Sequence, residues 1–409
     1  MNAANLSEIY PGYREEYGFP NEPRFFSGED FDRLLVHVAN HDAADLTLQT
    51  EEPAMAYIQG ENIRVTTRAM TSSEIEVITN HLYGQQNGVA EIRKGGEIDR
   101  RHSVVVRTTT PQGTTVTKAK YGFRVNVTGC WSRGDENGMQ ITCRTIKSLP
   151  PRLEDLGIEE GIAENLYPEN GLVLVCGPTG SGKSTLLAGA MRRVIEDPNS
   201  NRKIITGEAP IEYTYDDIPR SSAIVSQHEI PRHLPSFKAF VRNTLRRAPK
   251  IILVGESRDS ETVEASLAAS ETGHAVYSTV HSRSVAHTLA RLANLFPPAE
   301  RMTKVFELIE AFRLVIVQKL VKRADGKGRV ALREYLVFDQ VVRDHLRQAS
   351  SLREAEHMLS KLVERYGQTM LSSAQKAYDQ GLIPAYEVQQ LERQTQSSLI
   401  EAMASEFGS

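Results

Sequence analysis

The stretch Leu172-Val-Leu-Val-Cys-Gly177-Pro-Thr-Gly-Ser-Gly-Lys183-Ser184 decides the fold of this chain. It begins as a short, wholly apolar run and passes into a glycine-rich turn that ends in a lysine and a hydroxyl residue. Glycines let the backbone curl so that successive N–H groups point at a phosphate, and a following helix adds its positive dipole end. A strand, turn and helix of this kind predict a phosphate-binding loop.

The helix that the motif requires is predicted directly after it, because apolar residues recur at helical spacing. These residues are Leu186, Leu187, Ala190, Met191, Val194 and Ile195. The loop therefore predicts an ATP site, in which Lys183 reaches the β- and γ-phosphates and the Ser184 hydroxyl binds Mg²⁺. ATP and Mg²⁺ are the expected cofactors. The residues assigned to the phosphate loop are Gly177, Pro178, Thr179, Gly180, Ser181, Gly182, Lys183, Ser184 and Thr185.

Short apolar strands alternate with helices from Gly171 onward, which is typical of a parallel sheet covered on both faces. The predicted strands are 172–176, 203–206, 251–254, 275–280 and 315–320. Carboxylates follow two of them at the strand ends where sites in α/β sheets form. Glu256 is expected beside the metal, directly or through water, and beside the attacking water. Glu208 and Glu212 are candidates for the general base, with a solvated acidic loop as the alternative.

Changes in composition and in the pattern of apolar residues divide the whole chain into five expected parts. The expected parts are a mobile arm or strap (1–27), an N-terminal α+β domain (28–146), a proline-containing hinge (147–152), an ATPase domain (153–340) and a helical C-terminal region (341–409). In the N-terminal domain a helix is predicted to follow Ser27, and strands are predicted at 104–107, 114–117, 123–127 and 139–143.

Composition and charge exclude several classes of function. The chain is 40% hydrophobic and 24% charged, and its net charge of −4 argues against bulk electrostatic binding to nucleic acid. The three scattered cysteines predict neither a disulfide framework nor a zinc module. No export signal stands at the N-terminus, and the apolar run Leu172 to Cys176 is far shorter than the ~20 residues of a membrane span. Membrane association is therefore expected to run through partners.

The series GPTGSGKST, EAPIEY, LRRAPKIILVGESRD and ETGHAVYSTVH resembles the Walker A, Asp box, Walker B and His box of the secretion-motor ATPases exemplified by PilT and GspE. The resemblance runs from about Asp45 to roughly Arg347. Within that family the chain looks most like the DotB and TraJ type of type IVB secretion and conjugation. This narrower resemblance rests on the long N-terminal arm, the LRRAPK stretch and a C-terminal region without the AIRT-type signature of pilus motors.

The resemblance implies an α/β protein with an N-terminal α+β (PAS-like) domain, a RecA-like P-loop domain with a mostly parallel sheet, and a helical C-terminal tail. It implies that Glu256 is the Walker B acid and Glu212 the Asp-box acid, although Ala209 stands where that box usually has its aspartate. His274 and His281 match the His box, and both are expected at the active edge of the sheet.

Two arginines outside the nucleotide domain also match the family. Arg124 in Arg-Val-Asn and Arg144 in Arg-Thr-Ile correspond to arginines that approach the nucleotide from the N-terminal domain. Without the resemblance, the ordinary interpretation of both would be surface charge, and that of each histidine a hydrogen-bonded core residue.

The function that the resemblance implies is a homohexameric ATP hydrolase in the cytoplasm, held peripherally at the inner membrane by components of a secretion or conjugation complex. A type IV pilus or type II secretion motor is the alternative within the family. A nucleic-acid translocase is a third hypothesis, based on the basic residues Arg242, Arg246, Arg247 and Lys250. That cluster has no interleaved aromatic residues, so no stable direct binding of nucleic acid is expected.

Overall fold

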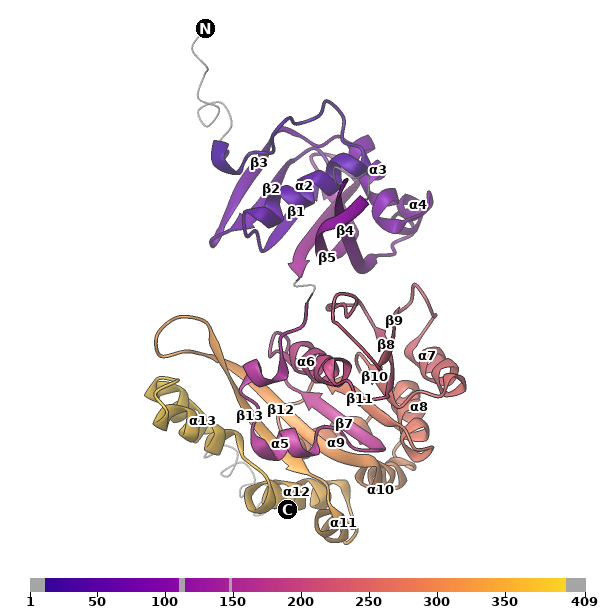
Figure 1. Ribbon diagram of the computed structural model, residues 1–409, viewed down its shortest axis with the longest axis vertical. Coiled ribbons are helices and arrows are strands. Elements are labelled where there is room, and N and C mark those ends of the chain that lie inside the picture. The colour runs from indigo at the N-terminus through magenta and orange to yellow at the C-terminus, as the bar shows by residue number, and fades with distance from the viewer. Residues whose placement is uncertain (1–11, 110–114, 147–148, 395–409) are drawn as a thin grey trace. The chain divides into compact units, whose positions relative to one another are not determined.

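The computed structural model describes residues 12–109, 115–146 and 149–394, which fall into two compact units (Figure 1). The first unit contains the described residues up to Leu149 together with the segment Ala209–Thr214. The second contains Pro150–Glu208 and the chain from Tyr215 onward. The boundary after Leu149 falls inside the expected hinge 147–152, of which residues 147 and 148 lie outside the described residues.

The second unit is built on a seven-stranded sheet in the order β13-β12-β7-β11-β10-β8-β9. All neighbouring strands run parallel except the edge strand β13, which is antiparallel to β12. The predicted parallel sheet is thereby confirmed, and its strands are β7 (Gly171–Cys176), β8 (Lys203–Glu208), β9 (Ile224–Glu229), β10 (Ile251–Val254), β11 (Ala275–Val280), β12 (Phe312–Lys322) and β13 (Arg329–Val337).

The central strand β7 is wholly buried because both of its faces meet a hydrophobic core. Leu172 and Leu174 enter the core on one face, and Val173 and Val175 enter the core on the other. A strand that is buried on both faces consists of a continuous run of apolar residues, and this run made the segment recognisable in the sequence. Helices cover both faces: η2 (Leu153–Leu156), α5 (Glu160–Asn165), α6 (Lys183–Glu196), α7 (Phe237–Thr244), η3 (Leu245–Arg247), α8 (Ser260–Glu271), α9 (Val285–Ala293) and α10 (Arg301–Ala311).

The C-terminal part of the chain is helical as far as it is described, and it packs on the strands and helices of the ATPase unit. Its helices are α11 (Gln340–Leu346), α12 (Leu352–Tyr366) and α13 (Met370–Asp379). Ala374, Ala377 and Leu391 form a smaller hydrophobic core with Val321 of β12 and Leu332 of β13. Leu346, Leu359 and Leu362 belong to the same hydrophobic core as β7 and α9. Residues 341–394 are thus an extension of the ATPase unit, and the remainder of the expected tail lies outside the described residues.

The first unit contains an antiparallel six-stranded sheet in the order β3-β2-β1-β6-β5-β4. Its strands are β1 (Asp45–Gln49), β2 (Pro53–Ile58), β3 (Glu61–Ala69), β4 (Ile98–Thr109), β5 (Thr115–Ser132) and β6 (Asp135–Ile146). Its helices are η1 (Glu15–Tyr17), α2 (Gly28–Asn40), α3 (Ser72–Tyr83) and α4 (Gly88–Arg93). The helix predicted after Ser27 is α2, which starts with a capping box formed by Ser27 and Asp30.

Two sequence expectations for this unit differ from the structure. The strands expected at 114–117 and 123–127 are parts of the single strand β5, because its pairing with β4 continues between them, with Tyr121 opposite Val104; residue 114 lies outside the described residues. The expected arm 1–27 packs on its own unit from Tyr13 onward, with Phe26 fully buried and the Phe19 N–H donating to the Val65 carbonyl at 2.8 Å. Residues 1–11 lie outside the described residues.

Candidate nucleotide-binding site

The phosphate loop connects β7 to α6 and depends on three glycines in the left-handed region of backbone space. Their φ angles are +141° at Gly177, +76° at Gly180 and +85° at Gly182, which other residues adopt only with strain. A Cβ added at Gly182 would lie 2.8 Å from the Nε2 of Gln318, so the loop also fits tightly against β12. No side chain caps the start of α6. The first turn of this helix is therefore suited to an anion.

The polar groups of the loop also fit a nucleotide phosphate. The Lys183 ammonium is largely buried and donates to the carbonyls of Gly177 at 3.0 Å and Pro178 at 2.9 Å. The Ser181 hydroxyl is buried and has no hydrogen-bond partner among the described residues. Phosphate oxygens accept bonds from both kinds of donor, so the residues present match the cofactors expected from the motif.

Glu256 lies just beyond the end of β10 and is mostly shielded from solvent. Its carboxylate makes ion-pair contacts with Arg258 at 2.7 Å and with the Nε2 of His281 at 3.5 Å. Burial, and next the positive charge of Lys183, lower the pKa of His281 from its usual value. The imidazole is therefore held toward its neutral form, in which it can accept or donate a hydrogen bond at neutral pH.

Neighbouring strands bring these groups to one edge of the sheet. In the parallel ladder Val280 lies opposite Cys176, so His281 and Gly177 leave adjacent strands at the same level. The next strand, β10, ends at Val254 and leads to Glu256. The Thr279 hydroxyl fixes this turn by donating to the Gly255 carbonyl at 2.6 Å. The phosphate loop, Glu256 and His281 thus share the carboxyl edge, where α/β proteins bind ligands.

The expectation that His274 shares this edge is wrong. His274 precedes β11, and its carbonyl accepts a bond from the N–H of Gly171, the first residue of β7. Its Nδ1 is bonded locally, 3.0 Å from the Ala269 carbonyl. A six-residue strand separates His274 from His281, which places it at the amino edge of the sheet. Two histidines that flank a strand lie at its opposite ends, and the sequence spacing alone contains this information.

The two acids of the EAPIEY segment belong to different compact units. Glu208 ends β8 in the second unit, where its Oε1 accepts from the Thr206 hydroxyl at 2.7 Å and from the Gln227 amide at 3.3 Å. Glu212 belongs to the first unit. There its carbonyl, and that of Ile211, accept bonds from the Nη1 of Arg101 at 2.9 and 3.1 Å.

Comparison with known proteins decides the family. The sequence matches the family described as type II/IV secretion system protein over residues 105–405. The chain belongs to this family of secretion and pilus ATPases. The ATPase DotB of Legionella pneumophila has a similar structure, with a TM-score of 0.83 and 41% identity over 91% of this chain and 98% of that chain.

Pilus motors of the same family are also similar. The type IV pilus ATPase PilT of Pseudomonas aeruginosa is 32% identical over 321 residues, which are 78% of this chain and 86% of PilT. A crystal structure of the pilus retraction motor PilT with bound ADP has a TM-score of 0.70 and 28% identity, covering 87% of this chain and 95% of that chain. The family resemblance found in the motifs is confirmed, and the chain is an ATPase of this family.

The two arginines that the motif comparison singled out lie in a row with Arg101 across the first unit's sheet. Arg124 on β5 pairs in register with Arg144 on β6 and with Arg101 on β4. Directly opposed residues of antiparallel strands point to the same face, so the three form one basic row. Arg124 forms an ion pair with Asp99 at 2.8 Å, and Arg144 is exposed. Sequence reasoning missed Arg101, because only the strand register reveals its place beside the other two.

A buried polar network behind the phosphate loop was also missed. The Gln318 amide donates to the Ser181 carbonyl at 2.6 Å and accepts from the Nε of Arg333 at 2.8 Å. Arg333 is 2% exposed and forms an ion pair with Glu159 at 3.0 Å. In the sequence, Gln318 and Lys319 only interrupt an apolar run, and the structure is needed to show that the Gln318 amide is buried and requires partners. This network ties the loop to the edge strand β13.

One member of the basic cluster considered for nucleic acid, Arg247, makes contacts inside the second unit, whereas Arg242, Arg246 and Lys250 are exposed. Arg247 contacts the His228 ring at 2.9 Å and donates to the Ser226 hydroxyl at 2.9 Å. Its carbonyl accepts from the Lys203 ammonium at 2.8 Å. These contacts give Arg247 a structural role in holding η3 to β8 and β9.

Among the described helices, none has the length and apolar character needed to cross a membrane.

Proposed function

We propose that this chain is a homohexameric motor that hydrolyses ATP to energise substrate transfer or assembly in a type IVB secretion or conjugation apparatus. The observation that carries the proposal is the similarity to DotB, which extends over 91% of the chain and so includes both the nucleotide edge and the arginine-bearing unit. The motor would work in the cytoplasm and dock on inner-membrane components of the apparatus. Type IV pilus function is the alternative, supported by the similarity to PilT.

The residues at the sheet edge support defined roles. Lys183 and the start of α6 would hold the phosphates, and the Ser184 hydroxyl with Glu256 would hold Mg²⁺, Glu256 directly or through water. Mg²⁺ supplies positive charge to the phosphate oxygens when it is bound. We assign Glu212 as the general base and Glu256 as its metal-and-water partner, with His281 sensing the γ-phosphate beside Glu256. Arg124 and Arg144 would supply positive charge as the γ-phosphoryl leaves.

The nucleotide chemistry is tested by substitutions at the carboxyl edge. Lys183→Ala should lower the rate of ATP hydrolysis by more than ~100-fold, because the charge on the β- and γ-phosphates is lost. Glu256→Gln should lower kcat while ATP still binds, because a residue that positions water acts mainly in the transition state. Glu261→Gln on α8 is the matched control, since the exposed side chain of Glu261 forms a surface ion pair with Lys238 at 3.3 Å. Wild-type turnover in a folded Lys183→Ala variant would refute the assignment.

The choice of base is tested by comparing two conservative changes. If Glu212 is the base, Glu212→Gln lowers kcat strongly and Glu208→Gln has the smaller effect. The reverse order would assign the role to Glu208, whose carboxylate already accepts two hydrogen bonds in the second unit. Measurements of kcat and of ATP affinity on both variants separate transition-state effects from binding effects.

The apparatus is tested by purification from native membranes. Recovery of an inner-membrane component of a type IVB or conjugation system with the wild-type chain supports the proposal. Recovery of pilus assembly proteins instead would assign the chain to a pilus motor. Salt-sensitive binding of single-stranded DNA by the purified chain would favour a translocase, which the internal contacts of Arg247 argue against.

A further inference from the structure

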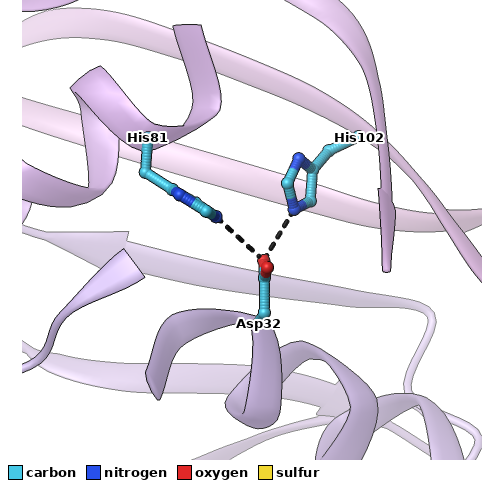
Figure 2. A group of neighbouring side chains, drawn as sticks. All are labelled: Asp32, His81 and His102. Atoms are coloured by element: carbon cyan, nitrogen blue, oxygen red, sulfur yellow. Dashed lines mark hydrogen bonds and ion pairs between the residues drawn. The ribbon is translucent and has the colours of Figure 1, made fainter. Parts of the chain in front are cut away.

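A cluster of two histidines and one aspartate lies in the first unit, and none of the three residues is among those assigned to the nucleotide. Asp32 is on α2, His81 is on α3 and His102 is on β4. Figure 2 shows both imidazole rings turned toward the Asp32 carboxylate. The Nε2 atoms of His102 and His81 lie 2.7 and 3.2 Å from the same oxygen, Asp32 Oδ1. Three elements far apart in the sequence thus converge on one point.

The spacing of these atoms is close to that of the ligands in the shell of a tetrahedral metal ion. One potential ligand atom from each residue lies within 4.8 Å of the other two. Zinc bonds of ~2.0–2.1 Å at tetrahedral angles place ligand atoms ~3.3 Å apart, so only small side-chain movements separate this arrangement from a coordination shell. We propose that Asp32, His81 and His102 form a binding site for a divalent transition-metal ion of the zinc class.

The ligand types favour this class of metal over the magnesium of the nucleotide site. Imidazole nitrogen binds zinc and similar ions, whereas magnesium takes oxygen ligands almost alone. Three protein ligands leave at least one coordination position for water, as in open zinc sites. The side chains of Asp32, His81 and His102 are 25%, 32% and 15% exposed. The site is therefore sheltered but still reachable by an ion from solvent.

Hydrogen bonding leaves part of this cluster unsatisfied. One carboxylate oxygen faces two imidazole nitrogens, and only His102 meets it with hydrogen-bond geometry. The Nε2 of His81 is buried and has no hydrogen-bond partner among the described residues, although it lies at ion-pair distance. Buried polar nitrogens without a partner are rare and require an explanation. A metal ion bound between the three groups would satisfy both nitrogens and the carboxylate together.

The start of α2 is shaped to hold the His81 ring in place. A Cβ added at Gly28 would lie 2.5 Å from both Cγ and Nδ1 of His81, so only glycine allows this approach. The first turn of α2 therefore fixes the ring, and Gly28 is a positioning residue for the site. A bound ion would connect α2 and α3 to β4 and so stabilise the first unit without involving the phosphate loop.

The proposal is tested on the full chain after chelation and without nucleotide, with Zn²⁺ as the probe. Calorimetric titration should find one tight site per chain, and a His81→Gln, His102→Gln double variant should bind at least ~10-fold more weakly at that site. Saturating Zn²⁺ should raise the unfolding temperature of wild type by roughly 4 °C or more, and this gain should be absent in the double variant.

His41→Gln is the matched control, because it removes a histidine from the other pair of this unit, whose rings are 4.5 Å apart. It should keep the tight site and the thermal gain. Equal Zn²⁺ affinity in the wild type and the double variant would overturn the proposal, since binding would then occur elsewhere. If the double variant does not fold, the wild-type chain is titrated with Co²⁺. Bound Co²⁺ should give a visible absorption band, and added Zn²⁺ should abolish it. Absence of this band would refute the site.

Discussion

At the scale of single residues, the phosphate loop depends on Gln318 as much as on its own glycines. This amide is 3% exposed and connects the Ser181 carbonyl to the buried guanidinium of Arg333. Its substitution leaves a buried carbonyl and a buried N–H without partners, and each unmet group costs about 1–3 kcal/mol. A residue with no direct contact to phosphate can therefore decide whether the loop keeps its shape.

Gln318→Leu should lower the free energy of unfolding by about 1–3 kcal/mol and weaken nucleotide binding several-fold. Chemical denaturation and titration with a fluorescent nucleotide measure the two effects. Gln375→Leu is the control, because this exposed glutamine bonds only Asp379 on the same helix in the contacts described. Unchanged nucleotide affinity in Gln318→Leu would show that the loop holds its conformation without this amide.

Glu74 is a single residue from which we predict that the stability of the fold depends on pH. Its side chain is fully buried and accepts bonds from Arg68, from the Phe26 N–H at 2.7 Å and from the Thr71 N–H at 2.9 Å. Burial alone would raise the pKa of this carboxyl, but the bonds, first those from Arg68, outweigh it and lower the pKa to about 2. The ionised form is thus the one that the fold stabilises.

Because this pKa is depressed, the stabilisation is present above the ordinary carboxyl pKa and is lost as pH falls toward about 2. Glu74→Gln should cost about 2–3 kcal/mol at pH 7, and the difference from wild type should shrink below pH ~4.5. Denaturation curves at several pH values measure this difference in the free energy of unfolding between variant and wild type. The control Glu76→Gln, on the same helix but in an exposed pair with Arg93, should show little change at any pH. A difference that stays constant down to pH ~3 would contradict the role of the ionised carboxylate.

At the scale of elements, local pattern explains what could and could not be predicted. The strands of the parallel sheet were recognisable because burial on both faces leaves unbroken apolar runs such as 172–176 and 251–254. Strand β9 was missed because its residues are mostly half-buried and polar, as in Ser226 and Gln227. The phosphate loop and Glu256 were predicted because their motifs directly follow two of these recognisable strands. Arg101, Gln318 and Arg333 were missed because their roles come from register and tertiary contacts, which no local pattern contains.

The arginine row of β4, β5 and β6 leads to a prediction about an element. Arg101 donates to the carbonyls of Ile211 and Glu212, and Gly122 makes room for it, since a Cβ there would lie 2.3 Å from its guanidinium. If Glu212 is the base, Arg101 is a positioning residue that fixes the backbone of Ala209–Thr214. Arg101→Gln should lower kcat by roughly 10- to 100-fold with little change in KM for ATP.

A structural readout separates this positioning role from general damage. Protease cleavage within 209–214 should become faster in Arg101→Gln, while the unfolding temperature changes little. Arg101→Lys should restore only part of the activity, because one ammonium lacks the fork geometry of a guanidinium. Arg133→Gln is the control, since Arg133 lies at the exposed turn between β5 and β6 and pairs with Glu52. A fall in kcat of the same size in that control would refute the role of Arg101.

At the scale of the whole molecule, the proposed catalytic groups divide between two compact units. Arg124, Arg144 and Glu212 belong to the first, whereas Lys183 and Glu256 belong to the second. A reaction that needs both sets depends on how units come together within a chain or between chains. If the arginines serve a neighbour's nucleotide, ATP hydrolysis per chain should rise with protein concentration until rings are complete.

Mixing two inactive variants then distinguishes action between chains from action within one. Lys183→Ala chains keep Arg144 but lack a working phosphate loop, and Arg144→Ala chains have the reverse defect. If Arg144 acts on the nucleotide of a neighbouring chain, mixed rings contain some intact sites and should regain part of the lost hydrolysis. If it acts within its own chain, no site is intact at any ratio.

Two controls belong to this experiment. Mixing must be verified by co-purification of tagged chains, and titration of the ratio of the two variants identifies mixed rings in which one inactive chain inhibits the others. Verified mixing without recovery, once the titration has excluded such inhibition, would refute action of Arg144 between chains.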